Sequence, residues 1–125
     1  MITVALVGAS PKTESLSYRL FHRLKTANYR TFPVNPKSPS IDGQKCFASL
    51  TDLPQKPDVV VFMVNPRITL ETLPLCVQLG IQKVRFQPET FDGQVIDFCR
   101  THHLIFENQK CLLVAPVSVL EAFVG

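Results

Sequence analysis

The chain has 125 residues, of which 46% are hydrophobic and 18% are charged, and its formal net charge is +3. This length accommodates one buried core but not two, so we expect a single domain over residues 1–125. The hydrophobic content excludes a disordered chain. Lysine and arginine are scattered, and no basic block contains interleaved aromatic residues, so we expect no nucleic-acid partner.

No apolar run approaches the ~18 residues that a membrane-spanning helix needs, so we expect no membrane partner. The first residues have no basic segment before the apolar run, which favours a strand over a signal peptide. The cysteines form no Cys-x-x-Cys pair, and no histidine has metal-ligand spacing to them. We therefore expect no metal site and a cytoplasmic protein with four reduced thiols: Cys46, Cys76, Cys99 and Cys111.

The first third of the chain has the pattern of a strand, a helix and a second strand. Residues 2–7 are continuously apolar, as in a strand that is buried on both faces of a parallel sheet. Residues 31–34 form the second expected strand, which Pro36 ends. Spacings of four, four and three predict a helix between them that buries one face, made of Leu16, Leu20, Leu24 and Ala27.

The middle of the chain contains a polar loop over 38–43, an extended piece over 44–47 and a helical turn over 51–53. Residues 59–64 are the most strand-like run and end at Asn65-Pro66. A helix is expected over about 69–79, with Gly80 as its C-terminal glycine. Pro74 either kinks this helix or marks its first turn.

The last third continues the alternation of strands and helices. Residues 84–87 and 104–106 are expected strands, and a helix between them carries an apolar stripe from Val95 to His102. Residues 112–114 and 119–124 form a terminal strand or helix. This order predicts an α/β class, with a Rossmann-like, doubly wound parallel sheet in a single three-layer domain.

The glycine turn after the first strand is the first candidate binding element. Gly8 allows a phosphate to approach the backbone, and the turn leads into a helix N-terminus. We expect Gly8→Val to abolish ligand binding and to leave the fold largely intact. Ser15 or Ser17 should cap the helix, and Arg19 either reaches the phosphates or is solvated. The other candidates in this turn are Ala9, Ser10 and Pro11.

The end of the second strand distinguishes between nucleotide ligands. A dinucleotide site that reads a ribose 2′-hydroxyl has Asp or Glu there, whereas this chain has Asn35, Pro36 and Lys37. A lysine at this position suits a ribose phosphate, although a lone lysine after a strand is often only a surface residue. Prolines at the strand ends would give rigid, apolar walls for a flat ring.

The motifs at 7–12, 17–19, 34–37 and 109–112 (VGASPK, SYR, VNPK and QKCL) resemble those of the coenzyme A-binding domain family. That family includes the amino-terminal domain of the succinyl-CoA synthetase alpha subunit and small stand-alone bacterial proteins. The resemblance implies a domain that holds CoA or an acyl-CoA by its adenosine-phosphate end. Residues 88–91 depart from the relatives, which often have a glycine after Gln87.

The resemblance also implies roles for individual residues. Those matching the loop that faces the pyrophosphate are Gly8, Ala9, Ser10 and Ser17. Those matching the segment along the adenosine and its phosphate are Val34, Asn35, Pro36 and Lys37. Those matching the turns beside the adenine and after the next strand are Val64, Asn65, Pro66 and Gln87.

Binding without catalysis is the leading functional hypothesis, because no nucleophile has an obvious base nearby and the synthetase's catalytic domain is absent from this sequence. One alternative is an enzyme acting on a CoA thioester through Cys111 or Glu107. Another is an NAD(H)-binding sensor that controls a protein partner, against which Asn35 argues. A protein partner, a homodimer and the identity of the acyl group remain open.

Overall fold

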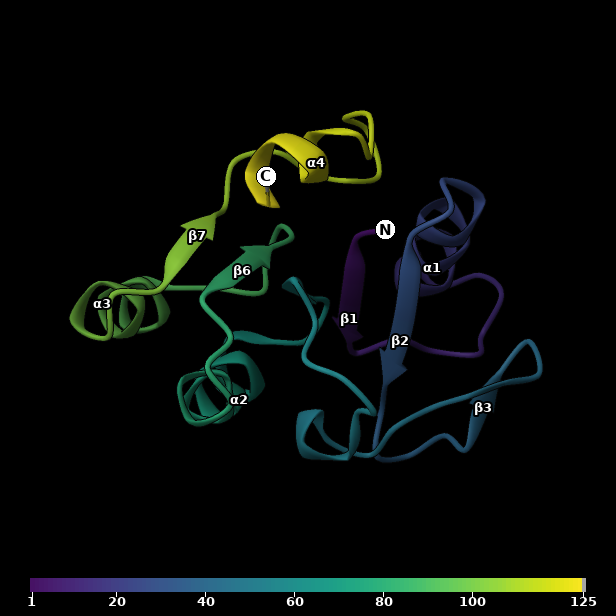
Figure 1. Cartoon of the computed structure of the whole chain (residues 1–125), viewed down its shortest axis with the longest axis horizontal. Coiled ribbons are helices and arrows are strands. Elements are labelled where there is room, and N and C mark those ends of the chain that lie inside the picture. The colour runs from purple at the N-terminus through teal and green to yellow at the C-terminus, as the bar shows by residue number, and fades with distance from the viewer. Residues whose placement is uncertain (125) are drawn as a thin grey trace.

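A computed structural model describes residues 1–124, which fold around a five-stranded parallel sheet (Figure 1). The strand order is β2-β1-β5-β6-β7, so the order reverses between β1 and β5. The chain runs outward from β1 to β2, returns to β5 on the other side of β1, and continues to β7. The strands are β1 (Thr3–Val7), β2 (Arg30–Val34), β5 (Val59–Phe62), β6 (Lys83–Phe86) and β7 (Ile105–Glu107).

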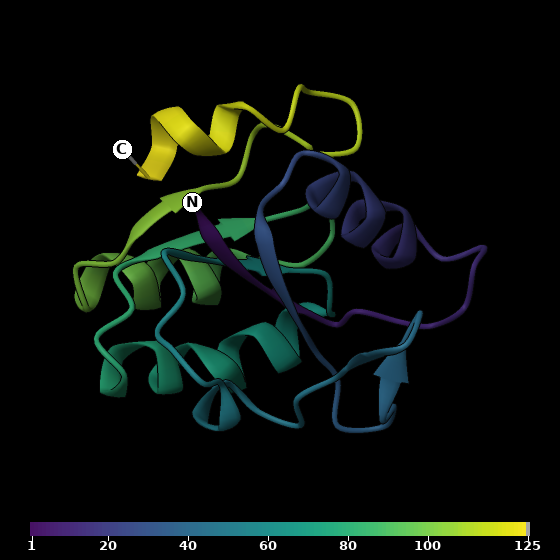
Figure 2. The same cartoon turned by 45° about the vertical axis from the view of Figure 1, so that its right-hand side comes forward.

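Helices cover both faces of this sheet. α1 (Leu16–Thr26) and α4 (Val119–Val124) lie on one side, and α2 (Pro66–Gln78) and α3 (Gly93–Thr101) lie on the other (Figure 2). The central strand β1 is buried along its whole length. Its side chains alternate, with Val4 and Leu6 in the core beneath α1 and Ala5 and Val7 in the core beneath α2 and α3. The expected three-layer, Rossmann-like α/β fold is confirmed.

The buried face of α1 differs from the one that the leucine spacing predicts. Leu20 and Leu24 are fully buried, but Leu16 is 54% exposed. The buried stripe instead begins at Ser17, whose hydroxyl accepts a hydrogen bond from the N–H of Ser10 at 3.1 Å. Because Ser17 turns toward this loop, its neighbour Leu16 faces outward. The expected serine cap is confirmed at Ser15, whose hydroxyl accepts from the N–H of Tyr18 at 3.1 Å.

α2 begins three residues before the expected start. The Asn65 side chain accepts a hydrogen bond from the N–H of Ile68 at 2.9 Å, and Pro66 occupies the first turn. Pro74 lies inside the helix, so the alternative that it marks the first turn is wrong. Gly80 follows the helix with a φ of +73°, as expected of a C-terminal glycine.

Between β2 and β5, the extended piece expected over 44–47 and the helical turn expected over 51–53 are present, whereas the loop expected over 38–43 contains an additional short strand. Strands β3 (Ser40–Ile41) and β4 (Gln44–Lys45) form a hairpin around Asp42-Gly43, and η1 (Leu50–Asp52) is a short 3-10 helix. Asp42 has a φ of +48° and Gly43 one of +77°, the left-handed backbone that a two-residue hairpin turn requires. Of the two forms expected for the C-terminal apolar segment, α4 shows the helix.

Leu20→Ala should lower the free energy of unfolding by roughly 2–5 kcal/mol, because it leaves a cavity between α1 and the sheet. Leu16→Ala in the same helix is the matched control, and its exposed side chain predicts a change within about 0.5 kcal/mol. Urea denaturation followed by circular dichroism measures both. Equal losses would place Leu16 in the core and contradict the orientation of α1.

Candidate functional site

The turn at Gly8 joins three strands at the carboxyl edge of the sheet. Gly8 has a φ of +97°, and its N–H donates to the carbonyl of Val34 at 2.9 Å. A Cβ at this position would lie 2.6 Å from the carbonyl oxygen of Met63 and 2.7 Å from Cγ1 of Val64. The expectation that a side chain at position 8 leaves the fold intact is therefore wrong, because β5 occupies that space.

A cavity of about 420 Å³ opens beside this turn, at the carboxyl ends of β1, β2 and β5. This is where the strand order reverses, the place at which open α/β sheets hold their ligands. Six of the candidate residues line it: Gly8, Val34, Asn35, Pro36, Lys37 and Val64. The others in its lining are Val7, Ala48, Ser49, Leu50, Met63, Ile68, Thr72 and Leu75.

Most of the lining residues missing from the sequence prediction come from α2 and the segment at η1. Ile68, Thr72 and Leu75 are spaced by four and three, so they share one helical face. The cap signal Asn65-Pro66 would have revealed this face, since a helix starting at Pro66 includes Ile68, whereas one starting at residue 69 does not. Leu50 is buried and follows Ser49, the cap of η1.

Asn35 holds two loops of the site together. Its Nδ2 donates to the carbonyl of Ala9 at 2.7 Å, and its Oδ1 accepts from the N–H of Lys37 at 2.9 Å. The glycine turn and the end of β2 are therefore fixed relative to each other. Pro36 and Lys37 are exposed at this point and line the cavity, and Lys37 has no salt-bridge partner among residues 1–124.

The serines of the glycine turn shape the turn itself. The buried Ser17 hydroxyl lies 3.3 Å from that of Ser15, which also donates to the carbonyl of Lys12 at 2.8 Å. The Ser10 hydroxyl accepts from the N–H of Lys12 at 3.2 Å. Ala9 is buried, and Pro11 is exposed next to Ser10. These contacts make a fixed turn at the N-terminus of α1.

The remaining candidates lie outside the cavity lining. Asn65 and Pro66 follow the lining residue Val64 and start α2. Arg19 is exposed on α1 and lines a separate, shallow groove of about 660 Å³ with Tyr18, His22 and Arg23. The structure does not bring Arg19 into the cavity beside Gly8.

Gln87 ties the C-terminal segment to the sheet. It is buried, its Nε2 donates to Sγ of Cys111 at 3.2 Å, and its Oε1 accepts from the N–H of Leu112 at 3.2 Å. Both ends of its amide are therefore occupied within the protein.

The cysteines differ in exposure. Cys111 is partly exposed, whereas Cys76 and Cys99 are buried, and burial raises the pKa of their thiols to about 12 and about 11.

Within the described part of the chain, all four cysteines are free, and no cluster of three or more His, Cys, Asp or Glu side chains could hold a metal ion. No helix over residues 1–124 is long and apolar enough to cross a membrane.

Comparisons with known proteins agree with this fold. A family model described as CoA binding domain matches residues 2–116. A conserved hypothetical protein from Pyrococcus furiosus has a TM-score of 0.86 and 30% identity, covering 91% of this chain and 98% of that one. A hypothetical protein from Pyrococcus horikoshii OT3 has a TM-score of 0.84 and 32% identity, covering 98% of this chain and 83% of that one.

The curated relatives are much longer proteins. An ADP-forming acetate–CoA ligase of Methanocaldococcus jannaschii is 31% identical over 80 residues, which are 64% of this chain and 11% of that enzyme. An ADP-forming acetate–CoA ligase I of Archaeoglobus fulgidus is 26% identical over 119 residues, covering 87% of this chain and 17% of the enzyme. Because the family match spans most of its length, the present chain belongs to the CoA-binding domain family.

Proposed function

We propose that this chain binds coenzyme A, free or acylated, by its adenosine-phosphate end in the cavity beside Gly8. The observation that carries the proposal is the position of Lys37, an exposed cation that lines an otherwise largely apolar cavity at the point of strand reversal. Family membership supports CoA as the ligand.

The walls of the cavity suit an adenine ring. Leu50 of η1, Val64 of the turn after β5 and Ile68 of α2 contribute apolar side chains, and Pro36 adds a rigid wall. A volume of about 420 Å³ lies within the range of small-molecule sites and holds part of a ligand as large as CoA. The rest of the ligand would extend along the sheet edge.

Two elements suit the phosphates of CoA. The Lys37 ammonium offers a positive charge for the 3′-phosphate on the ribose. The Gly8–Ser10 turn leads to the N-terminus of α1, where backbone N–H groups and the helix dipole favour the pyrophosphate. Asn35 links these two elements through its bond to Ala9.

Binding without catalysis is the proposed role. Lys37 is the one ionisable side chain in the cavity lining, so the lining contains no pair of an acid and a base or of a nucleophile and a base. The curated ligases carry this segment as 11% to 18% of their length, which supports a binding module within a larger assembly or beside a partner.

We propose the cytoplasm as the location of this protein.

Isothermal titration calorimetry of the wild-type protein should show tighter binding of CoA than of dephospho-CoA, by about ten- to a hundredfold, because only CoA offers a phosphate to Lys37. NAD, which lacks the 3′-phosphate of CoA, should bind more weakly than CoA. Thermal denaturation should confirm binding, with a stabilisation of about 2.7 kcal/mol at a ligand concentration of a hundred times Kd. A protein that binds NAD more tightly than CoA would overturn the proposal.

Lys37→Ala should weaken the binding of CoA by about ten- to a hundredfold and leave the binding of dephospho-CoA nearly unchanged, because the lost contact is charge-assisted and specific to the 3′-phosphate. Lys45→Ala is the matched control, since it removes the same charge from the nearby β4 strand, outside the cavity lining. Calorimetry at low and high salt measures both variants. Equal losses for the two ligands, or equal effects of the two substitutions, would contradict a direct contact by Lys37.

A further inference from the structure

Lys37 lies in a segment that leaves the sheet after β2 and is held together by its own hydrogen bonds. We call this segment, residues 35–47, the hairpin arm. The N–H of Asn35 donates to the carbonyl of Phe47 at 2.9 Å at its base, and the N–H of Cys46 donates to that of Pro39 at 3.0 Å further out. β3 and β4 form its tip. These bonds link the base, the middle and the tip of the arm, so a contact at its tip bears on the position of Lys37 near its base.

The tip is held against α1 by three side chains, which we call the clamp: Tyr18 and His22 on α1, and Asp42 in the turn between β3 and β4. The Tyr18 hydroxyl donates to Oδ2 of Asp42 at 2.8 Å, and Nε2 of His22 lies 2.5 Å from the same oxygen. The Tyr18 and His22 rings are 4.5 Å apart between their centroids. These residues are one helical turn apart on α1, so both reach the same carboxylate.

A second contact runs beside the clamp. Nζ of Lys25 donates to Oε1 of Gln44 at 2.8 Å, and Nε2 of Gln44 donates to the carbonyl of Thr31 in β2 at 2.7 Å. Lys25 also faces Asp42, whose pKa is lowered chiefly by the hydrogen bond from Tyr18 and further by His22 and Lys25. The pKa of the Tyr18 hydroxyl is raised by the same hydrogen bond.

The clamp connects the two elements proposed to hold phosphates. Ser15, the N-cap of α1 beside the glycine turn, lies three residues before Tyr18, and the hairpin arm carries Lys37. In CoA, the pyrophosphate and the 3′-phosphate are attached to the same ribose, so their separation is nearly constant. A protein that holds both must keep its two elements at a matching separation.

We infer that Asp42 is a positioning residue, through which the clamp fixes the hairpin arm on α1 and so sets the preference for CoA over dephospho-CoA. This inference rests on the proposed function. Asp42 lies outside the cavity lining and acts through the position of Lys37. The contribution is one of preorganisation, because an arm that is already fixed loses less conformational entropy when the ligand binds.

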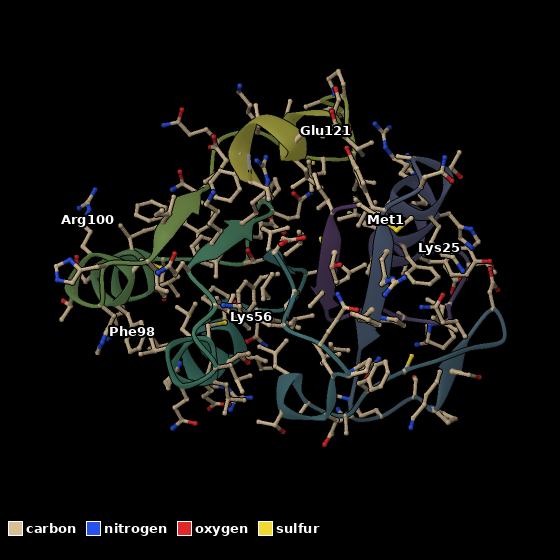
Figure 3. All side chains as sticks on the ribbon, in the orientation of Figure 1. Met1, Lys25, Lys56, Phe98, Arg100 and Glu121 are labelled. Carbon is tan, nitrogen blue, oxygen red and sulfur yellow. The ribbon has the colours of Figure 1, made fainter. Side chains whose placement is uncertain are left out.

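The test compares three variants by calorimetry with CoA and dephospho-CoA. Asp42→Gly removes the carboxylate, while glycine adopts the φ of +48° that the turn needs. Asp42→Asn keeps an acceptor for the Tyr18 hydroxyl and should partly restore the wild-type behaviour. Asp97→Asn is the matched control, because Asp97 is an exposed carboxylate on α3; Figure 3 shows the α3 residues Phe98 and Arg100 on the opposite side from Lys25.

Asp42→Gly should reduce the preference for CoA over dephospho-CoA by about three- to tenfold, chiefly through weaker CoA binding. Hydrogen exchange should quicken in the hairpin arm and stay unchanged in β1 and β5. In the Lys37→Ala background, Asp42→Gly should have little further effect on CoA, because the two residues act on one contact.

The outcomes separate this inference from the proposed function. A wild-type protein that binds no CoA contradicts the proposed function and, with it, the role of Asp42. Wild-type binding with an unchanged preference in Asp42→Gly contradicts the inference alone. The inference alone is also contradicted if Asp42→Gly and Lys37→Ala have additive effects on the affinity for CoA. A loss of preference for CoA over dephospho-CoA in Asp97→Asn as large as that in Asp42→Gly would contradict it too.

Discussion

The close packing of Gly8 against the end of β5 is the constraint on which the rest of the site depends. Its N–H bonds to Val34 in β2, while the space that a Cβ would fill belongs to Met63 and Val64. One residue thus brings the ends of three strands together at the point of strand reversal. Glycine is required here by the fold before any ligand is considered, and the cavity opens beside this packed turn.

The hairpin arm serves the sheet as well as the site. β2 is an edge strand, and the arm covers that edge, since the N–H of Phe47 donates to the carbonyl of Pro33 and its carbonyl accepts from Asn35. Pro33 itself offers no N–H to a neighbouring chain. The same arm carries Lys37 to the cavity, so protection of the sheet edge and presentation of a positive charge have one structural origin.

The order of strands and helices could be predicted from the sequence because the central strands β1 and β5 are buried, largely apolar runs, with Gly8 and Pro66 soon after their ends. The strand-end candidates Gly8 and Lys37 followed from the same reasoning and lie together on the cavity. The wall formed by Ile68 is absent from the sequence prediction, because the helix is expected to start at residue 69 and the cap signal at Asn65 is not used. The role of Gln87 could not be predicted either. Its side chain bonds to residues 24 and 25 positions later in the chain, and no local sequence pattern reveals such a contact.

A crystal structure of the protein with CoA is the sharpest test of this binding mode. The adenine should lie between Leu50 and Ile68, the pyrophosphate at the Gly8–Ser10 turn, and the 3′-phosphate within hydrogen-bond distance of Nζ of Lys37. The competing location is the shallow groove on α1 that Arg19 lines. CoA bound in that groove, or in the cavity with Lys37 turned away from the 3′-phosphate, would show that the proposed binding mode is wrong.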